Sequence, residues 1–293
     1  MFVDGTPPRR ADQATRLRRL VQTADVGGAA RSIAVTSGKG GVGKSNIAVN
    51  LAACLAGRGL RVTLVDSDIG LANDDVLLGL RCTHNLSHVL SGHRGMEDIA
   101  VDAPGGFRFV PGLSGGQRSM DLSASQCRQL IGQMADLEAG SDVVLADCGA
   151  GLSRNVLAFA MAVDAVLLVT TPEPTAVADA YATIKRLWRE QCRARIHLLV
   201  NLASSRAEAR ETFQRIAQVA EKFLKYPIAD GGYLLQDTHV EMAVRTRCPF
   251  VLRYPRCPAS ACLGAVAVRM AKRTTRPVAE GGCFRRVVGL FVP

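Results

Sequence analysis

Residues 33–50 read IAVTSGKGGVGKSNIAVN, in which an apolar run leads through a glycine-rich turn into an apolar-periodic segment. The part from Gly38 to Ser45, GKGGVGKS, fits the phosphate-binding pattern G-x-x-x-x-G-K-[ST]. Glycines let backbone N–H groups come close to phosphate oxygens, and the start of the following helix adds its positive end. The stretch therefore predicts a strand, a P-loop and a helix that bind a nucleoside triphosphate, rather than a plain glycine turn.

The side chains of this loop predict how the triphosphate is held. Lys44 can reach the β- and γ-phosphates, and the hydroxyl of Ser45 can ligate Mg²⁺. We expect nucleotide contacts along the whole loop and at the first turn of the helix. The predicted nucleotide-binding residues of this stretch are Gly38, Lys39, Gly40, Gly41, Val42, Gly43, Lys44, Ser45 and Asn46.

Lys39 is a second lysine within the loop, and an ordinary P-loop does not need it. The run KGGVGKS resembles the deviant Walker A loop of the MinD/ParA (SIMIBI) ATPases. The resemblance implies that Lys39 crosses a homodimer interface to the partner's ATP. A second cation at the phosphates would stabilise the charge that develops during phosphoryl transfer, so Lys39 and Lys44 are both predicted to be catalytic. The alternative for Lys39 is a solvated loop lysine.

The composition is that of a globular protein, with 48% hydrophobic, 21% charged and only 5% aromatic residues among 293. A core of aliphatic side chains suits a buried parallel sheet. We expect one doubly wound α/β domain over residues 31–272, with a mostly parallel sheet and helices on both faces. Residues 1–30 and 273–293 are expected to be appendages.

The net charge of +10 favours an acidic partner such as nucleic acid, anionic lipid or an acidic protein. The positive charge is concentrated near the two ends, so basic tails are favoured over one basic groove, and a merely solvated basic surface is the alternative. The nine cysteines include no C-x-x-C pair, which is typical of a reduced, cytosolic protein and does not favour an iron–sulfur carrier. No signal peptide is recognisable at the N-terminus.

Carboxylates follow two further strand patterns. Asp66 and Asp68 follow the predicted strand 61–65, and Asp147 ends the predicted strand 142–147. Carboxyl ends of parallel strands meet at the edge where ligands bind. The run DSDIGLAN resembles the MinD switch I, which implies Asp68 for the attacking water and Asp66 for the outer shell of the metal, although the two roles can be exchanged. Asp147 is predicted to reach Mg²⁺ through water, as a Walker B aspartate does.

Two later segments also resemble the family. Asn201 follows the predicted strand 196–200, which implies that it reads adenine, because an amide can match the exocyclic amine and a ring nitrogen. A turn asparagine is the alternative. Near Asp237 the family's Pro-x-Asp is replaced by a run without proline, which puts base contacts there in doubt. Glu173 and Asp179, in TPEPTAVADAY, are the predicted dimer-interface residues.

The N-terminal appendage contains DQATRLRRLV, a short amphipathic pattern at 12–21 with arginines on its polar face. D-Q-A-x-x-L-R resembles the N-terminal motif of the flagellar-number branch of the MinD-like ATPases (FlhG, also called FleN or YlxH). The resemblance implies that residues 11–21 bind an FlhF-type SRP GTPase. A helix packed on its own domain, or an unstructured tail, is the alternative.

The C-terminal appendage places four apolar residues at i, i+3, i+4 and i+7 beside arginines, namely Phe284, Val287, Val288 and Phe291. Eight residues cannot span a bilayer, but they can lie on its surface. The stretch 283–291 resembles the membrane-targeting helix of the branch. One such tail binds weakly, whereas two on a dimer bind better through effective concentration. A tail packed on the body is the alternative.

Taken together, the patterns predict an ATP- and Mg²⁺-dependent dimerising ATPase that resembles FlhG. The resemblance implies control of flagellar number or placement, in the cytoplasm and at the inner face of the cell membrane, with flagellar switch or regulatory proteins as further candidate partners. A ParA-type DNA-partitioning ATPase is one alternative, supported by the charge and less favoured because of the two appendages. A regulatory scaffold that binds ATP without hydrolysing it is the other.

Overall fold

The computed structural model describes residues 30–68, 72–113, 136–151 and 153–271. Its strands are β1 (Arg31–Ser37), β2 (Val62–Asp66), β3 (Val101–Ala103), β4 (Phe107–Val110), β5 (Val143–Ala150), β6 (Ala165–Thr170), β7 (Arg195–Ala203) and β8 (Ala229–Leu235). Its helices are α2 (Lys44–Ala56), α3 (Asp74–Leu78), α4 (Leu86–Leu90), α5 (Met96–Ile99), α7 (Arg154–Ala162), α8 (Pro174–Arg189), α9 (Arg206–Leu224), α10 (Thr238–Arg245), α11 (Phe250–Arg253) and α12 (Pro258–Ala271).

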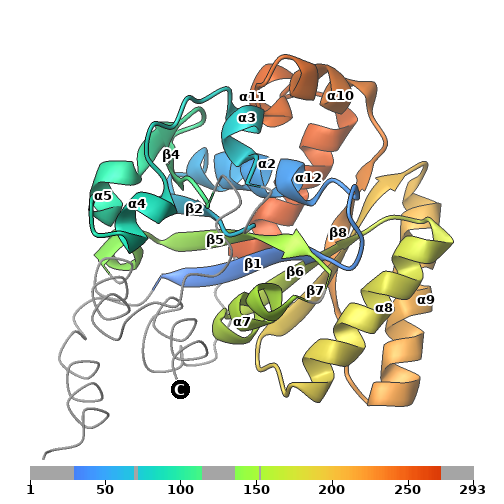
Figure 1. The fold of residues 1–293 in the computed structure, drawn as a ribbon. Coiled ribbons are helices and arrows are strands. Elements are labelled where there is room, and N and C mark those ends of the chain that lie inside the picture. The colour runs from blue at the N-terminus through green and yellow to red at the C-terminus, as the bar shows by residue number, and fades with distance from the viewer. Residues whose placement is uncertain (1–29, 69–71, 114–135, 152, 272–293) are drawn as a thin grey trace, which may run out of the picture.

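The strands form one sheet in the order β3-β4-β2-β5-β1-β6-β7-β8. All neighbouring strands run parallel except β3 and β4, which pair antiparallel at one edge. The β1 strand lies between β5 and β6, so the loop that follows it opens near the middle of the sheet (Figure 1). This order confirms the predicted doubly wound α/β architecture.

Helices cover both faces of the sheet, because the central strands are apolar on both sides. On one face, Ile33, Leu64 and Leu145 pack with α2 and α12. On the other face, Ala34, Val144 and other alternate residues pack with α7, α8 and α9 (Figure 1). Successive strand residues point to opposite faces, which explains why neighbours in the chain belong to different clusters.

Several observed elements agree with the sequence patterns, and others were not predicted. The sequence patterns predict a strand at 107–110 and a helix at 205–224, and β4 and α9 match them to within one residue. The prediction missed β3, α7, α10 and α11, and it ended the strand before Asn201, whereas β7 continues to Ala203. The sequence pattern predicts a last strand at 232–235, whereas β8 begins at Ala229.

The N-terminal pattern at 12–21 and the C-terminal pattern at 283–291 lie outside the described residues. The sequence also predicts a helix at 123–139, of which only residues 136–139 are described. In the part of the chain that the structure describes, no helix combines the length and apolar character needed to cross a bilayer.

Candidate nucleotide site

The loop between β1 and α2 takes a backbone path that depends on glycine. Gly41 and Gly43 have φ values of +81° and +85°, in the left-handed region that side chains with a Cβ disfavour. The hydroxyl of Ser37, at the end of β1, donates to the carbonyl of Lys39 at 2.8 Å and closes the start of the loop. The helix α2 begins directly after Gly43, so its positive end faces the loop. This is the geometry of an anion-binding loop.

Gly38 is needed for a different reason, which is close packing. A Cβ at this position would lie 2.4 Å from both the carbonyl carbon and the oxygen of Asp179, and 2.8 Å from the backbone nitrogen of Ala180. These are backbone atoms of α8, so they cannot move aside as a flexible side chain can. The loop is therefore fixed in place against the helix that carries the predicted interface residue Asp179.

We expect Gly38→Ala to lower the free energy of unfolding by about 1–3 kcal/mol, the usual cost of overpacking. The displaced loop should also weaken ATP binding at least about tenfold, or about 1.4 kcal/mol. Urea denaturation and calorimetry with ATP and Mg²⁺ measure the two effects. Gly40→Ala is the control for stability, because its Cβ would meet no atom within 4 Å. Equal stability of the Gly38→Ala variant and the parent would contradict the packing argument.

Lys44 points at the carboxylate of Asp147 across the site. Its Nζ lies 2.9 Å and 3.0 Å from the two carboxylate oxygens of Asp147, and 3.0 Å from Oγ of Ser45. Burial opposes the charge of Lys44, but Asp147 holds its pKa above the ordinary value. Lys44, the predicted phosphate ligand, thus hydrogen-bonds both Ser45 and Asp147, which are predicted metal ligands.

Asp66 lies beside Asp147, because the two are register partners on β2 and β5. Its Oδ1 accepts from the N–H of Asp68 at 3.1 Å, and its Oδ2 accepts from those of Asn73 and Asp74 at 3.1 Å and 3.3 Å. Burial, and then the charge of Asp147, raise the pKa of Asp66 to about 7. Asp66 therefore hydrogen-bonds backbone groups at the start and at the end of the predicted switch segment, residues 66–73, and its side chain also faces the site.

Asp68 lies on the open side of the cluster, with 23% of its side chain exposed and its Oδ2 3.8 Å from Nζ of Lys44. A Cβ on Gly149 would lie 2.9 Å from Oδ1 of Asp68, so the glycine after the β5 carboxylate makes room for this side chain. A carboxylate placed beside the phosphate-binding lysine, yet reachable by water, fits the predicted position for orienting a nucleophile.

Asp74 joins the cluster, although its sequence pattern predicts only the start of a short helix at 74–80. Carboxyl oxygens of Asp66, Asp74 and Asp147 all lie within 4.8 Å of one another. Asp74 has no exposed surface, and neither of its carboxyl oxygens accepts from an N–H or hydroxyl group of the described residues. Its hydrogen-bonding neighbour in the described part of the chain is the carboxyl group of Asp147, with which it can share a proton. Burial, followed by the charges of Asp147 and Asp66, holds the pKa of Asp74 well above its ordinary value. The signal that could have located it was the run NDD seven residues after Asp66.

These residues fit a magnesium ion, which prefers oxygen ligands such as carboxylates and hydroxyls. The orphaned buried oxygens of Asp74 indicate that the cluster lacks positive charge. Ser45, Asp66 and Asp147 are the residues that would hold Mg²⁺, directly or through water. When bound, the ion would neutralise phosphate charge during phosphoryl transfer.

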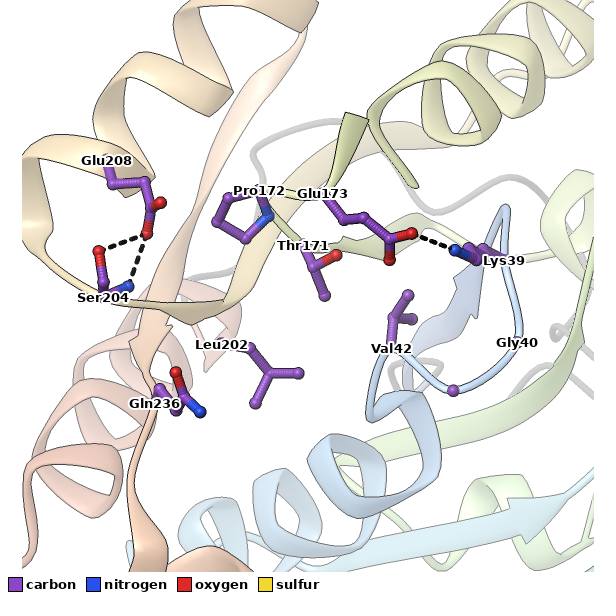
Figure 2. A pocket seen from close by; sticks show the side chains of 11 residues that line it. Lys39, Gly40, Val42, Thr171, Pro172, Glu173, Leu202, Ser204, Glu208 and Gln236 are labelled. Carbon is purple, nitrogen blue, oxygen red and sulfur yellow. Dashed lines mark hydrogen bonds and ion pairs between the residues drawn. The ribbon is translucent and has the colours of Figure 1, made fainter. Parts of the chain in front are cut away.

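Lys39, the second lysine of the loop, lies away from this cluster. Its Nζ contacts Oε1 of Glu173 at 2.6 Å (Figure 2). It also contacts Oγ1 of Thr175 at 2.7 Å. Both partners of the ion pair are exposed, at 35% for Lys39 and 54% for Glu173. Lys39 and Glu173 are both predicted to lie at the dimer interface. In the structure they form an ion pair within a single chain.

A groove of about 480 Å³ runs from the loop to the ends of β7 and β8 (Figure 2). Lys39 to Val42 line one side of it, and Leu202, Ser204 and Gln236 line the other. Leu202 is 43% exposed with φ of 55°, and sequence reasoning missed both it and Gln236 as groove residues. Leu202 and Gln236 both come just after a predicted strand, and this position is the sequence signal that they share.

Asn201 is not among the residues that line this groove. Its side chain is buried, and its Nδ2 donates to the carbonyl of Val42 at 2.8 Å. A Cβ on Gly43 would lie 2.5 Å from the same Nδ2. Asn201 therefore supports the phosphate loop, and this leaves its Oδ1 as the atom that could face a base.

The carboxylate of Asp237 stabilises the fold through hydrogen bonds to the starts of two helices. Its side chain is 6% exposed. It accepts from the N–H of His239 at 3.0 Å, from Nδ1 of His239 at 2.7 Å and from the N–H of Ala259 at 3.1 Å. It thus caps α10 and ties the start of α12 to it. Burial alone would raise its pKa, but the hydrogen bond from Ala259 and those from His239 lower the pKa to about 2.

We expect Asp237→Ala to lower the free energy of unfolding by about 2 kcal/mol at pH 7, because a cap and charge-assisted hydrogen bonds are lost. The pKa is depressed in the folded state, so this stability is present above the unfolded pKa of about 4 and is lost as the pH falls toward 2. Urea denaturation between pH 7 and pH 2 should show the two proteins converging in that range. A difference independent of pH would contradict the assignment, and the exposed Asp102→Ala is the control.

Cys148 follows Asp147 but does not carry chemistry. Its side chain is fully buried, and burial raises the pKa of its thiol to about 12. A thiol with that pKa supplies almost no nucleophilic thiolate at neutral pH.

A family model described as the CobQ/CobB/MinD/ParA nucleotide binding domain matches residues 33–247. This range covers most of the chain and includes the loop, the carboxylate cluster and the groove, and the chain therefore belongs to this family. It is an ATPase of the MinD/ParA type that binds ATP.

Among curated proteins, the chain is similar to Antiactivator FleN of Pseudomonas aeruginosa, with 42% identity over 81% of this chain and 85% of FleN. It is also similar to the Flagellum site-determining protein YlxH of Helicobacter pylori, with 36% identity over 72% of this chain and 73% of YlxH. A chain of the Aquifex aeolicus MinC:MinD cell division protein complex matches with TM-score 0.68 and 25% identity, over 86% of this chain and 100% of that one. MinD from Pyrococcus horikoshii, complexed with Mg-ADP, shares the fold with TM-score 0.69 and 22% identity, over 83% of this chain and 96% of that one.

Proposed function

We propose that this chain is an ATP-controlled switch that regulates the number or placement of flagella. The observation that carries the flagellar part is the 42% identity to FleN over most of both chains, and the 36% identity to YlxH supports it. The double-lysine loop, with Lys39 at the exposed rim of the groove, supports a switch that works through a second copy of the chain.

The proposed roles follow the geometry of the cluster. The backbone of residues 38–46 and the ammonium of Lys44 bind the triphosphate. Ser45, Asp66 and Asp147 hold Mg²⁺, and Asp68 orients the attacking water from the open side of the site. Asn201 supports the loop and presents its free carbonyl oxygen toward the base.

Dimerisation requires Lys39 to leave Glu173. An ion pair between exposed side chains contributes little to stability, so the phosphates of ATP in a second copy can compete for this lysine. Glu173 and the neighbouring Asp179 then lie at the dimer interface. In this scheme ATP and Mg²⁺ promote the dimer, and hydrolysis returns the chain to the monomer.

Deleting the gene in the organism that carries it tests the flagellar role. We expect an altered number or position of flagella by electron microscopy, restored by the parent gene and not by one encoding Lys44→Ala, with immunoblots showing equal protein levels. Unaltered flagella after deletion would overturn the proposal.

The two appendages supply the proposed output. Residues 11–21 bind an FlhF-type SRP GTPase, and residues 283–291 bring the ATP-bound dimer to the inner face of the cell membrane. Anionic liposomes should sediment with the full chain in ATP, and deletion of residues 283–293 should abolish this while ATP affinity stays unchanged. Unchanged sedimentation would remove the membrane part of the proposal.

A further inference from the structure

We propose that Asp74 is a further carboxylate of the magnesium site, and that with Asp66 and Asp147 it lets the protein hold one divalent cation before any nucleotide binds. This inference rests on the magnesium role proposed above for Asp66 and Asp147. It assigns Asp74 a role that the P-loop and switch patterns did not.

The first argument is the burial of an unsatisfied charge-bearing group. Asp74 is fully buried, and both of its carboxyl oxygens lack a hydrogen-bond donor among the described residues. Burying such a group without a partner costs folding free energy, so buried carboxylates are normally paired or bound to a metal. No lysine or arginine in the described ranges forms an ion pair with Asp74 or Asp66.

The second argument is distance. One carboxyl oxygen from each of Asp66, Asp74 and Asp147 lies within 4.8 Å of the other two. Oxygens about 2.1 Å from one octahedral ion are separated by roughly 3 to 4 Å, so small side-chain movements suffice to bring all three onto it or onto its bound waters.

The third argument is the local charge. Three buried carboxylates and the half-buried Asp68 surround a single ammonium, that of Lys44. Lys44 hydrogen-bonds both oxygens of Asp147, yet each carboxylate oxygen keeps a second lone pair. A divalent cation would therefore compensate charge that Lys44 leaves uncompensated at Asp66 and Asp74.

The position of Asp74 links this site to the switch segment. Asp74 is the first residue of α3, and its own N–H donates to Oδ2 of Asp66 at 3.3 Å. A cation held by both carboxylates would fix the start of α3 relative to β2. Metal binding would thereby hold α3 in place before ATP arrives.

The test uses the full-length protein, stripped of metal and nucleotide, and Mn²⁺ as a paramagnetic probe for Mg²⁺. Electron paramagnetic resonance of free Mn²⁺ should show one ion bound per chain, displaced by excess Mg²⁺. Asp74→Asn should weaken this binding at least about tenfold, in the range typical of residues that support a metal site. Asp75→Asn, on the same helix but half-exposed, should stay within about twofold of the parent.

Thermal unfolding provides a second readout. In EDTA the Asp74→Asn variant should unfold at a higher temperature than the parent, because one buried carboxylate has been removed. Added Mg²⁺ should raise the unfolding temperature of the parent more than that of the variant. If Asp74→Asn does not fold, Asp74→Ala takes its place in both measurements.

The inference is overturned if the nucleotide-free parent binds no Mn²⁺, or if the Asp74→Asn variant binds Mn²⁺ as tightly as the parent. Equal binding is the result expected if Asp74 is protonated and shares its proton with Asp147 instead of binding the metal. Repeating the titration with ATP separates this failure from the failure of the magnesium role. Mn²⁺ binding that occurs only in the presence of ATP contradicts the inference and leaves the magnesium role of Asp66 and Asp147 in place. No Mn²⁺ binding with or without ATP contradicts that magnesium role as well.

Discussion

Replacing Lys44 with alanine is expected to abolish ATP binding, with a loss of affinity of at least about 100-fold, or about 2.7 kcal/mol. Lys44 is the one ammonium within reach of the carboxylate cluster in the described part of the site. Without Lys44, no ammonium in that part of the site offsets the repulsion between the negative charge of the triphosphate and the carboxylates of Asp147 and Asp68. Isothermal titration calorimetry with ATP and Mg²⁺ measures the effect.

The same substitution should also destabilise the fold. The side chains of Lys44 and Asp147 are 8% and 1% exposed, and removing one partner of such a buried pair costs about 3–5 kcal/mol. Binding must therefore be measured at a temperature where circular dichroism shows the variant folded. Lys185→Ala, at an exposed position on α8, is the matched control. ATP binding by the folded Lys44→Ala variant at the parent's affinity would contradict the proposed phosphate site.

Replacing Asp68 with alanine should lower ATP turnover at least about 100-fold, the size of effect typical of losing a general base or water-positioning group. ATP affinity should change by less than about threefold, because Asp68 is partly exposed and lies outside hydrogen-bonding distance of Lys44. Phosphate release and calorimetry, run on the same preparation, separate the two quantities.

Asp102→Ala, on the exposed edge strand β3, is the control for Asp68→Ala. The choice between the two switch carboxylates is also tested here. Asp66 is buried and accepts three backbone N–H groups, so Asp66→Ala should disturb folding, whereas Asp68→Ala should not. Normal turnover by the Asp68→Ala variant would contradict its role toward the attacking water.

The parts of the site that the sequence predicted are those encoded locally. The loop and the start of α2 follow from eight consecutive residues, Gly38 to Ser45. The meeting of Asp66 and Asp147 follows from a rule of parallel sheets, since both are predicted at the carboxyl ends of strands that meet at one edge. In the structure Asp66 ends β2, whereas β5 continues past Asp147 to Ala150, and the two aspartates are register partners.

The features that escaped prediction depend on contacts between distant segments. Lys39 and Glu173 are 134 residues apart, and Asn201 is 159 residues from Val42. No local pattern brings these pairs together. Asp74 escaped because an acidic residue at the start of a helix is ordinarily a surface feature, and only the three-dimensional structure shows it to be fully buried.

The missed elements have local reasons. The helix α7 reads RNVLAFAMA, which is apolar on nearly every side, so no polar face marks a helical period. Only the start of β8 was missed, because its two glycines weaken a strand pattern. Gly231 is required there because a Cβ would lie 2.9 Å from the backbone of Leu198.

Sedimentation velocity in ATP and Mg²⁺ tests the central claim most directly, because the whole account depends on two copies that share their nucleotides. The parent should sediment as a dimer in ATP and as a monomer in ADP, and Lys39→Ala should remain a monomer in both while still binding ATP. A parent that stays monomeric at saturating ATP, or a Lys39→Ala variant that dimerises as the parent does, would contradict it.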